Sequence, residues 1–521
     1  MKKNEHLISL QPLTIDDLDT FLQKRYEIGF SAEMRPRIDA ARQVIDNILA
    51  ARKPVYGVNT GFGNFSEVRI PLETVNELQR RLVLSHAAGV GPPMPLDIVR
   101  LMMLLKIKSL ALGHSGCRWE TIQLLTDMLN HQILPCIPQK GSVGASGDLA
   151  PLAHMALVLI GQGSAFVADS DHRSGSEWQQ LDGKQALKKY NLKPITLAAK
   201  EGLAILNGTQ AITAYGIWAV IKARQLVKIA DIIGAMTLEA LLGTLTPFDE
   251  RIQQIRNHPG QVLVAENFRR ILPDSPIVDS HKESDHKVQD AYSLRCIPQV
   301  HGAARDGLTF VTDVFLREAN GVTDNPLVFS ETREVLSGGN FHGAPVAGAA
   351  DFLAILMTDL ASISERRIEH LLDHSVSELP PFLTTEGGLN SGFMMAHVTA
   401  AALLSECKVL SHPASVDSIP TSANKEDHVS MGLHAARKAS EIVENLEHIL
   451  SIELLCACQA LDLRAPLKPA PGTNAVLQLA RKKIPFWKED RLIAKDIDFS
   501  RELIRSGKII AAAEKVTGRL W

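Results

Sequence analysis

The sequence has few cysteines and no excess of basic residues, and each absence excludes a class of protein. Six cysteines occur among 521 residues, none in a CxxC spacing, so neither a zinc site nor a disulfide framework is indicated. Lysine and arginine number 55 against 58 acidic residues, and the formal net charge of -3 cannot neutralise a phosphate backbone. We therefore expect a protein of the reducing cytoplasm with no nucleic-acid partner.

Long uncharged apolar runs are also missing. The first 21 residues contain two lysines but no apolar stretch behind them, so no secretory signal is expected. The most apolar long stretch, residues 229–245, carries Asp231 and Glu239, which favours a core helix over a membrane-spanning one. We therefore expect no membrane partner.

The common motifs of nucleotide and metal chemistry are absent as well. There is no Walker loop, GxGxxG or HExxH, and Ser146 is preceded by Gly144-Ala145 rather than placed in a GxSxG elbow. His370 and His374 have the i, i+4 spacing of two metal ligands, but no third ligand is signalled nearby. We expect these two histidines to lie on a solvated helix face, and we expect no metal.

What the sequence does contain is a set of long helical patterns. Apolar residues recur at helical spacing through residues 197–236, 346–373 and 438–462, which are rich in Ala and Leu. Helices that are apolar on several faces need partners all round. The patterns predict a mainly α fold with a long-helix bundle as its core, extended by homo-oligomerisation.

The first part of the chain is more mixed. Glycine-dense loops, YGVNTGFGNF, GVGPPMP and GSVGASGD, separate its helical stretches, and the polar segment 168–184 indicates a solvated loop or hairpin. We therefore predict two domains. A smaller, loop-rich N-terminal domain covers residues 1–195, and a central long-helix bundle domain covers residues 196–521.

Three very small residues, Ala145-Ser146-Gly147, stand just before an apolar helix start. A backbone amide can attack the carbonyl carbon two residues earlier only in a very tight turn, which a residue without Cβ permits. Gly147 supplies the nitrogen, Ala145 an unhindered carbonyl and Ser146 a hydroxyl that can leave as water. The product is a five-membered ring with an exocyclic methylidene, an electrophile that no side chain provides. On these three residues alone, a small-residue turn that caps a helix is the simpler interpretation.

The surrounding sequence resembles the aromatic amino-acid ammonia-lyases and aminomutases. GSVGASGDLAPLAHMA is similar to the family's signature, from which its members form 4-methylidene-imidazol-5-one (MIO). The resemblance implies that the N-terminal domain carries an MIO made from Ala145, Ser146 and Gly147, with no external cofactor. Seven further blocks match in order: YGVNTGFG (56–63), LSHAAGVG (84–91), GLAILNGTQ (202–210), VQDAYSLRCIPQVHG (288–302), DNPL (324–327), SGGNFH (337–342) and SIPTSANKEDHVSMG (418–432).

The same resemblance implies roles for five residues in these blocks. Tyr56 would remove the β-proton of the substrate, while Asn207 and Tyr292 would form hydrogen bonds near the MIO and the substrate. Gln289 would make a polar contact, and Arg295 would bind the substrate carboxylate, which suits the fork of a guanidinium. Tyr292 and Arg295 share a helical face if their segment is helical. The alternatives are a structural tyrosine at 56, a helix-interior asparagine at 207 and a surface ion pair at 295.

Two blocks bear on the substrate. In the family, a Ser-His pair and an acidic residue accompany histidine, and this chain has Ser85-His86 and Glu426. A carboxylate can accept the imidazole proton or stabilise imidazolium, and Phe341 would pack on the ring. The resemblance implies non-oxidative deamination of L-histidine to trans-urocanate and ammonia, by a homotetramer whose active sites draw on more than one subunit. An MIO lyase or aminomutase acting on tyrosine, phenylalanine or another aromatic amino acid is the alternative, and a non-catalytic helical scaffold is a third.

Two residues depart from the family pattern. Lys425 stands where the histidine-specific members usually have Gln, and Ala344 stands where an acidic residue is common. Lys425 either pairs with Glu426 and holds it ionised, or draws it away from the substrate ring. A solvated carboxylate beside Lys425 is the alternative for Glu426. We expect the pocket to accept histidine with an altered pH optimum.

Overall fold

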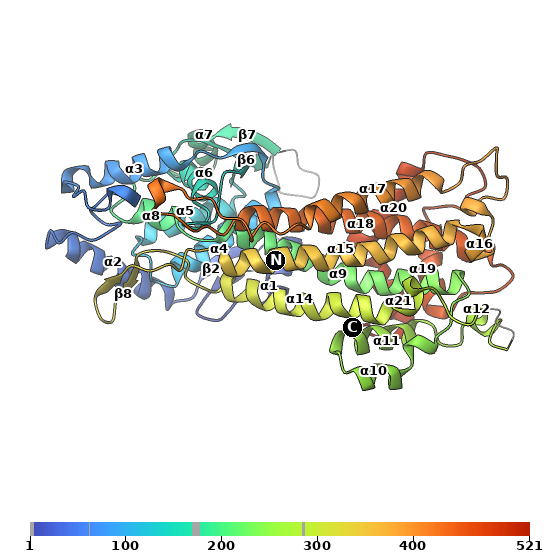
Figure 1. Cartoon of the computed structure of the whole chain (residues 1–521). Coiled ribbons are helices and arrows are strands. Elements are labelled where there is room, and N and C mark those ends of the chain that lie inside the picture. The colour runs from blue at the N-terminus through green and yellow to red at the C-terminus, as the bar shows by residue number, and fades with distance from the viewer. Residues whose placement is uncertain (1–4, 25, 62, 169–177, 284–286) are drawn as a thin grey trace. The chain divides into compact units, whose positions relative to one another are not determined.

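The chain was described with a computed structural model that covers residues 5–24, 26–61, 63–168, 178–283 and 287–521. Helices make up most of it (Figure 1), and the predicted mainly α fold is confirmed. The chain folds as two compact units. The first unit comprises Met1–Trp218, Thr312–Asp351 and Pro413–Arg437, and the second comprises Ala219–Val311, Phe352–His412 and Lys438–Trp521.

The first unit holds most of the short elements. Its helices are α1 (Ile15–Gln23), α2 (Met34–Ala50), α3 (Val75–His86), α4 (Leu96–Ala111), α5 (Trp119–Asn130), α6 (Leu149–Leu159), α7 (Gly183–Lys189) and α8 (Glu201–Leu206). Its strands are β1 (Glu5–Ile8), β2 (Glu27–Phe30), β3 (Val90–Pro93), β4 (Leu134–Pro135), β5 (Pro138–Lys140), β6 (Ser164–Ala168), β7 (Trp178–Asp182), β8 (Leu327–Phe329) and β9 (Glu334–Leu336).

The second unit is built from helices. Those confined to it are α10 (Glu250–Arg256), α11 (Pro259–Ile271), α12 (Pro276–Asp279), α13 (Tyr292–Arg295), α16 (His374–Ser377), α17 (Met394–Leu410), α19 (Pro471–Arg481), α20 (Ile493–Arg505) and α21 (Lys508–Thr517). The long helices α9 (Gln210–Ala240), α14 (Ile297–Ala319), α15 (Ala344–Leu372) and α18 (Gly432–Leu463) have residues in both units. The first break between the two units falls after Trp218, inside the continuous helix α9. The domain boundary after residue 195 stays a prediction.

The sheets of the first unit are small. β1 and β2 pair in parallel, β3 pairs with β5 and β8 with β9 in antiparallel ladders, and β4, β6 and β7 form one three-stranded antiparallel sheet. In the last of these, Ala168 of β6 faces Trp178 of β7. The two paired strands belong to the segment 168–184, for which we expected a solvated loop or hairpin. Residues 169–177, which connect the strands, lie outside the described residues.

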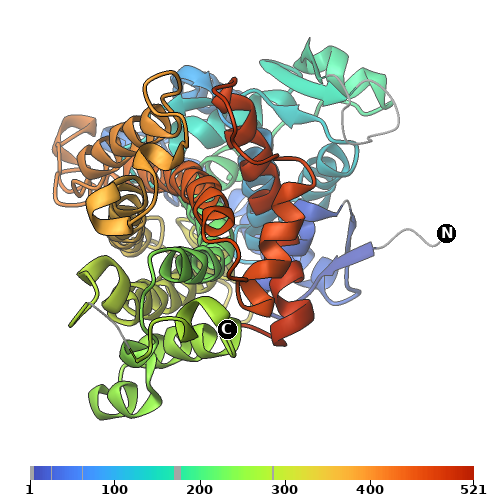
Figure 2. The same ribbon diagram turned by 90° about the vertical axis from the view of Figure 1, so that its right-hand side faces the viewer.

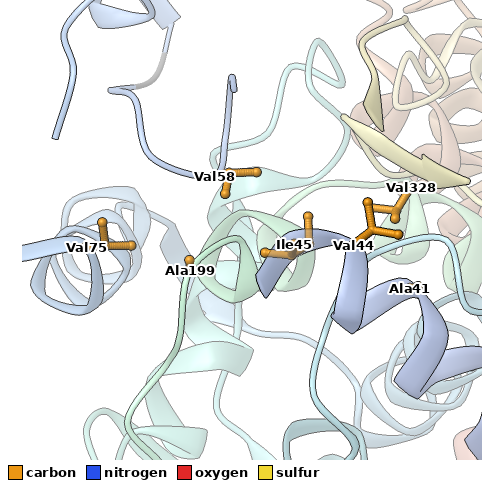
Figure 3. Packing of buried hydrophobic residues seen from close by; sticks show 7 residues of the cluster. All are labelled: Ala41, Val44, Ile45, Val58, Val75, Ala199 and Val328. Atoms are coloured by element: carbon orange, nitrogen blue, oxygen red, sulfur yellow. The ribbon is translucent and has the colours of Figure 1, made fainter. Parts of the chain in front are cut away.

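A hydrophobic cluster in the first unit joins segments that are far apart in the sequence. Figure 3 shows Val44 and Ile45 of α2 close to Val328 of β8, with Val58 from the following loop and Val75 from α3. All are buried, and the half-buried side chains of Val55, Ile70 and Val335 pack against the cluster. Burial of this apolar surface anchors both ends of the loop that follows α2.

In the second unit the long helices run side by side. Figure 1 shows the α9, α14, α15 and α18 segments of this unit together with α17, and Figure 2 views them nearly along their length. α15 is the one described helix that is long and apolar enough to cross a membrane, but 67% of its most apolar window is buried. A core helix of a bundle has the same composition.

Charged residues inside this bundle are matched in pairs. Arg367 of α15 donates from Nε and Nη2 to the two carboxylate oxygens of Glu453 on α18, at 2.5 and 2.9 Å. Thr237 of α9 and Ser364 donate to the same carboxylate. Arg367 and Glu453 are almost completely buried, and this saturation of hydrogen bonds offsets the cost of removing two charges from water.

A buried histidine extends the pairing to two more helices. Arg367 can only donate, so its contact with Nε2 of His301, at 3.2 Å, requires that nitrogen to accept. Nδ1 then carries the proton and donates to Asp231, at 2.7 Å. Arg305 neutralises the same aspartate. Burial lowers the pKa of His301, so the histidine is neutral and the four remaining charges balance.

This charge balance predicts the effect of removing one partner. Arg367→Met leaves the Glu453 carboxylate buried without its cation, and the free energy of unfolding should fall by about 3–5 kcal/mol. Arg367→Met combined with Glu453→Gln should recover part of that loss. Thermal or urea unfolding at fixed protein concentration measures both. A single variant as stable as the wild type would contradict the pairing.

Candidate active site

The triplet Ala145–Gly147 lies between β5 and the start of α6, in the first unit. Ala145 and Gly147 are buried and Ser146 is half-buried. Gly147 has a φ of +72°, in the left-handed region, and a Cβ at this position would lie 2.2 Å from the carbonyl oxygen of Gly208. No residue with a side chain fits, so the glycine is required for both conformation and space.

The segment against Gly147 is a break between two helices. α8 ends at Leu206, Asn207 is extended with φ −84° and ψ 134°, and α9 begins at Gln210. Gly208 pairs with Gly147 in an isolated parallel bridge, and its carbonyl accepts a 2.7 Å hydrogen bond from the amide of Asp148. The alternative of a helix-interior asparagine is therefore wrong for Asn207, because the apolar pattern on both sides of it belongs to two helices.

Asn207 also carries an unsatisfied acceptor. Its side chain is buried, and its Oδ1 has no hydrogen-bond partner among the described residues. A buried acceptor left unpaired costs about 1–3 kcal/mol, and such a cost is typical of a position where a ligand supplies the donor.

Asp148 clamps the triplet to the start of α9. It is fully buried, and its carboxylate accepts hydrogen bonds from the amide of Ile212 at 2.8 Å and from the hydroxyl of Ser142 at 3.0 Å. Burial raises the pKa of Asp148 to about 7, although these hydrogen bonds oppose the rise. The Asp148 carboxyl group therefore connects the triplet loop to α9. At neutral pH this group is close to the midpoint of its titration.

Glu426 reaches the triplet from the opposite side. Its Oε1 accepts a 2.6 Å hydrogen bond from the hydroxyl of Ser146, and its Oε2 accepts from Thr421 at 2.7 Å and Ser422 at 3.0 Å. Burial raises the pKa of Glu426, but these hydrogen bonds and the nearby His86 outweigh it and leave the pKa below its ordinary value. The carboxylate is therefore ionised at neutral pH.

Lys425 does not pair with Glu426. It is exposed, and it forms no ion pair with any described residue. Of the possibilities left open for Lys425, the ion pair with Glu426 does not form in this structure, in which three hydroxyl groups donate to the carboxylate. Ala344, the second departure, is the exposed first residue of α15, and it does not line the cavity that contains Ser146.

That cavity has a volume of about 860 Å³ and is lined by residues of the first unit, including Tyr56, Ser146, Phe341 and Glu426. Phe341 comes from the loop between β9 and α15. Mixed polar and aromatic walls of this size suit a small amino acid. Lys425 also lines the cavity.

Tyr56 lies on the loop that the hydrophobic cluster anchors. Burial raises the pKa of its phenol, a hydrogen bond with the backbone of Gly63 opposes the rise, and the negative charge of Glu426 adds to it. The net shift is upward. These surroundings disfavour the phenolate form of Tyr56. A tyrosine that acts as a base requires that form.

His86 is the last residue of α3, and its ring is fixed by that helix. Nδ1 lies 2.9 Å from the carbonyl oxygen of Leu82 and 3.0 Å from the hydroxyl of Ser85. Burial lowers the pKa of His86, and the nearby Glu426 partly opposes the shift. His86 is not among the residues that line the cavity, although its charge interacts with the carboxylate that does.

The remaining three predicted site residues belong to the second unit. Gln289, Tyr292 and Arg295 line another cavity, of about 870 Å³. Arg295 stacks over the Tyr292 ring at 4.6 Å, as the predicted shared helical face requires, and Tyr292 is 70% exposed. Nε of Arg295 is buried without a hydrogen-bond partner among the described residues, and the side chain lines the cavity. That these residues join Ser146 in one site stays a prediction.

Sequence reasoning missed the residues that hold the triplet in place. Asp148 directly follows it, and its position before Leu149, at the start of a helix, is the signal that could have singled it out. Ser142 and Thr421 gave no such signal, because their role depends on contacts with residues distant in the sequence.

Comparison with known proteins identifies relatives over nearly the whole chain. The sequence model of the family described as aromatic amino acid lyase matches residues 13–482. A histidine ammonia-lyase from Myxococcus xanthus is 49% identical over 517 residues, which cover 99% of this chain and 100% of that protein. The crystal structure of histidine ammonia-lyase from Trypanosoma cruzi is 44% identical with a TM-score of 0.90, covering 98% and 95% of the two chains. Tyrosine aminomutase from Streptomyces globisporus is 34% identical with a TM-score of 0.91, covering 99% of each chain.

The raised pKa of Asp148 predicts a pH dependence of stability. Because the folded state binds this proton more tightly than the unfolded chain, Asp148 favours folding at low pH, and that contribution is lost as the pH rises from about 4 to about 7. A shift of about three pKa units corresponds to roughly 4 kcal/mol. The stability of the wild type relative to Asp148→Asn should therefore fall between pH 5 and pH 7 and level off by pH 8. Thermal unfolding of both proteins across this range is the measurement, and a constant difference would contradict a buried, protonatable Asp148.

Proposed function

This chain belongs to the aromatic amino acid lyase family and is a carbon–nitrogen lyase, and we propose that it is a histidine ammonia-lyase. It would remove ammonia from L-histidine without oxidation and release trans-urocanate. The observation that carries the choice of substrate is the ionised carboxylate of Glu426, which lines the cavity and touches the hydroxyl of Ser146.

The residues of the triplet fit the family's MIO group, which would form from Ala145, Ser146 and Gly147 without an external cofactor. Gly147 has a φ of +72° and has no room for a Cβ against Gly208, so the position is restricted to the one residue that permits a very tight turn. The unpaired Oδ1 of the buried Asn207 is available to a donor beside the triplet. When formed, the MIO supplies an electrophile that captures the substrate and turns its amine into a better leaving group.

Glu426 would read the imidazole ring of the substrate. After the Ser146 hydroxyl is lost in ring formation, Thr421 and Ser422 still donate to Glu426 and favour its carboxylate form, which can accept the ring proton or stabilise imidazolium. Phe341 lines the same cavity and can pack against the ring. His86 would lie close to Glu426 as a neutral imidazole, because burial lowers its pKa.

Tyr56 would remove the β-proton. Burial and Glu426 raise the pKa of its phenol, so ionisation needs a positive charge brought into the cavity. The ammonium group of an arriving amino acid is one such charge. The phenolate form of Tyr56 would therefore be favoured only when the site is filled, which limits ionisation of the empty enzyme.

The carboxylate of the substrate would bind Arg295, with Gln289 and Tyr292 beside it. We propose that a second copy of the chain brings this group to the cavity of the first, in a homotetramer with shared active sites. Exposed apolar side chains on α17 are compatible with association, because Met395, Val398 and Val409 are 59%, 50% and 74% exposed. We place the enzyme in the cytoplasm, with a small molecule as its only other partner.

A lyase or aminomutase acting on another aromatic amino acid is the second candidate, favoured by the 34% identity with a tyrosine aminomutase. One assay separates the candidates. L-Histidine, L-tyrosine and L-phenylalanine are offered in turn, and the ultraviolet absorbance of each conjugated product is followed. Urocanate formed from histidine alone supports the proposal. Product from tyrosine or phenylalanine alone supports the second candidate, and no product from any of the three indicates a non-catalytic scaffold.

Mass spectrometry tests the ring independently of turnover. The peptide that contains Ala145–Gly147 should weigh less than its sequence requires by two waters, one from ring closure and one from the Ser146 hydroxyl. An unmodified mass would contradict the MIO.

The structure also predicts which of two neighbouring residues reads the substrate. Glu426→Gln should lower kcat/KM for L-histidine by about 10- to 100-fold, because a hydrogen bond to a charged group is worth about 1.5–3 kcal/mol. Lys425→Gln is the matched control. It should leave the pH profile of turnover unchanged, because Lys425 does not pair with Glu426. A shifted pH profile in Lys425→Gln would mean that the two side chains are coupled in the working enzyme.

A further inference from the structure

A buried lysine donates a hydrogen bond to the backbone segment that pairs with the triplet, and it forms no ion pair with a described carboxylate. Lys106 belongs to α4, which is buried along almost its whole length, and its side chain is only 1% exposed. Its ammonium donates a 2.5 Å hydrogen bond to the carbonyl oxygen of Asn207. Within the part of the chain that the structure describes, Lys106 forms no ion pair.

This arrangement is costly for the fold. A buried ammonium loses its hydration, and one peptide oxygen replaces only part of it. Burial lowers the pKa of Lys106 to about 8, although the more distant charge of Asp324 opposes the shift. A methionine of similar volume would fill the same space without this cost. A costly charge next to an active site is typical of a group that serves the chemistry.

The atom that Lys106 touches belongs to the peptide that holds the triplet. The carbonyl of Asn207 and the amide of Gly208 form one planar group, and Gly208 is the residue that pairs with Gly147. The next carbonyl, that of Gly208, accepts from the amide of Asp148. A cation on a peptide oxygen fixes the orientation of the plane and makes its amide a stronger donor. The charge of Lys106 thus acts on the backbone that lies directly against Ala145–Gly147.

We propose that Lys106 is a positioning residue of this active site: its ammonium holds and polarises the Asn207–Gly208 peptide against Ala145–Gly147. The inference rests on the proposed function, because the triplet is the reacting part of the chain. Lys106 itself touches neither the triplet nor the cavity. Its loss should therefore impair ring formation and turnover while leaving the fold and the binding of L-histidine largely intact.

The same helix provides a matched control. Lys108 is also 1% exposed, and its ammonium also donates to backbone carbonyls, those of Ser9 at 2.6 Å and Gln11 at 2.8 Å. Burial lowers its pKa as well. The two lysines thus differ in one respect that matters: Lys106 holds the active-site backbone, and Lys108 holds the N-terminal segment.

The test compares Lys106→Met and Lys106→Gln with Lys108→Met and the wild type, all as full-length protein. Circular dichroism and thermal unfolding report the fold, the mass of the Ala145–Gly147 peptide reports ring formation, and kcat and KM are measured with L-histidine. Both Lys106 variants should fold. They should show incomplete loss of the two waters or a kcat lower by about 100-fold, the loss that a small displacement of active-site groups can cause, with KM little changed. Lys108→Met should keep the wild-type peptide mass and kcat.

The role of Lys106 would be overturned if Lys106→Gln or Lys106→Met had the wild-type peptide mass and kcat. An equal loss of kcat in Lys108→Met would also overturn it. So would failure of both Lys106 variants to fold while Lys108→Met folds. The proposed function fails separately, through a wild-type protein that converts none of the three amino acids. In that case the peptide masses alone still decide whether Lys106 supports ring formation.

Discussion

The close approach of Gly147 to Gly208 is the constraint on which the whole site depends. Two backbone segments meet so tightly that a single Cβ on Gly147 would lie 2.2 Å from the opposing carbonyl oxygen. The approach requires that the apolar run from α8 to α9 be interrupted, since a continuous helix would leave no extended backbone to meet the triplet. It also requires Asp148, which ties the triplet to the first turn of α9. The smallness of the triplet is therefore a demand of packing as much as of chemistry.

Buried charge is used in two different ways in this protein. In the second unit, Arg367 and Glu453 satisfy each other with two parallel hydrogen bonds, and the pair stabilises the bundle only as a pair. In the first unit, Lys106 and Asp148 are buried with neutral partners, and burial moves the pKa of each toward neutrality. The first arrangement serves the fold. The second places two groups whose ionisation is disfavoured by burial, Lys106 and Asp148, next to the backbone of the triplet, where we propose that Lys106 serves the reaction.

Much of this could be predicted from the sequence, and the failures have physical causes. Helical periodicity predicts the mainly α fold, because a pattern of apolar residues is a local property of the chain. Helical periodicity does not predict the interruption between α8 and α9 at Asn207, since the residues on both sides of it are equally apolar. The sequence leaves the role of Lys425 open, because adjacent residues are consistent with an ion pair but do not require one. In the structure, the hydroxyl groups of Ser146, Thr421 and Ser422 bind Glu426. Contacts between segments that are distant in the sequence determine where these side chains bind, and such contacts cannot be derived from a single sequence.

We propose that the close approach of Gly208 to Gly147 holds Ala145, Ser146 and Gly147 in the turn from which they form the MIO ring. Gly208 has a φ of +128°, a conformation that residues with a side chain rarely adopt, so an alanine would strain this segment and shift it relative to Gly147. The most direct measurement is the mass of the Ala145–Gly147 peptide from folded Gly208→Ala protein, taken beside the wild type. We predict that the wild-type peptide lacks two waters and that the variant peptide retains them. A folded variant whose peptide has also lost both waters would contradict the account.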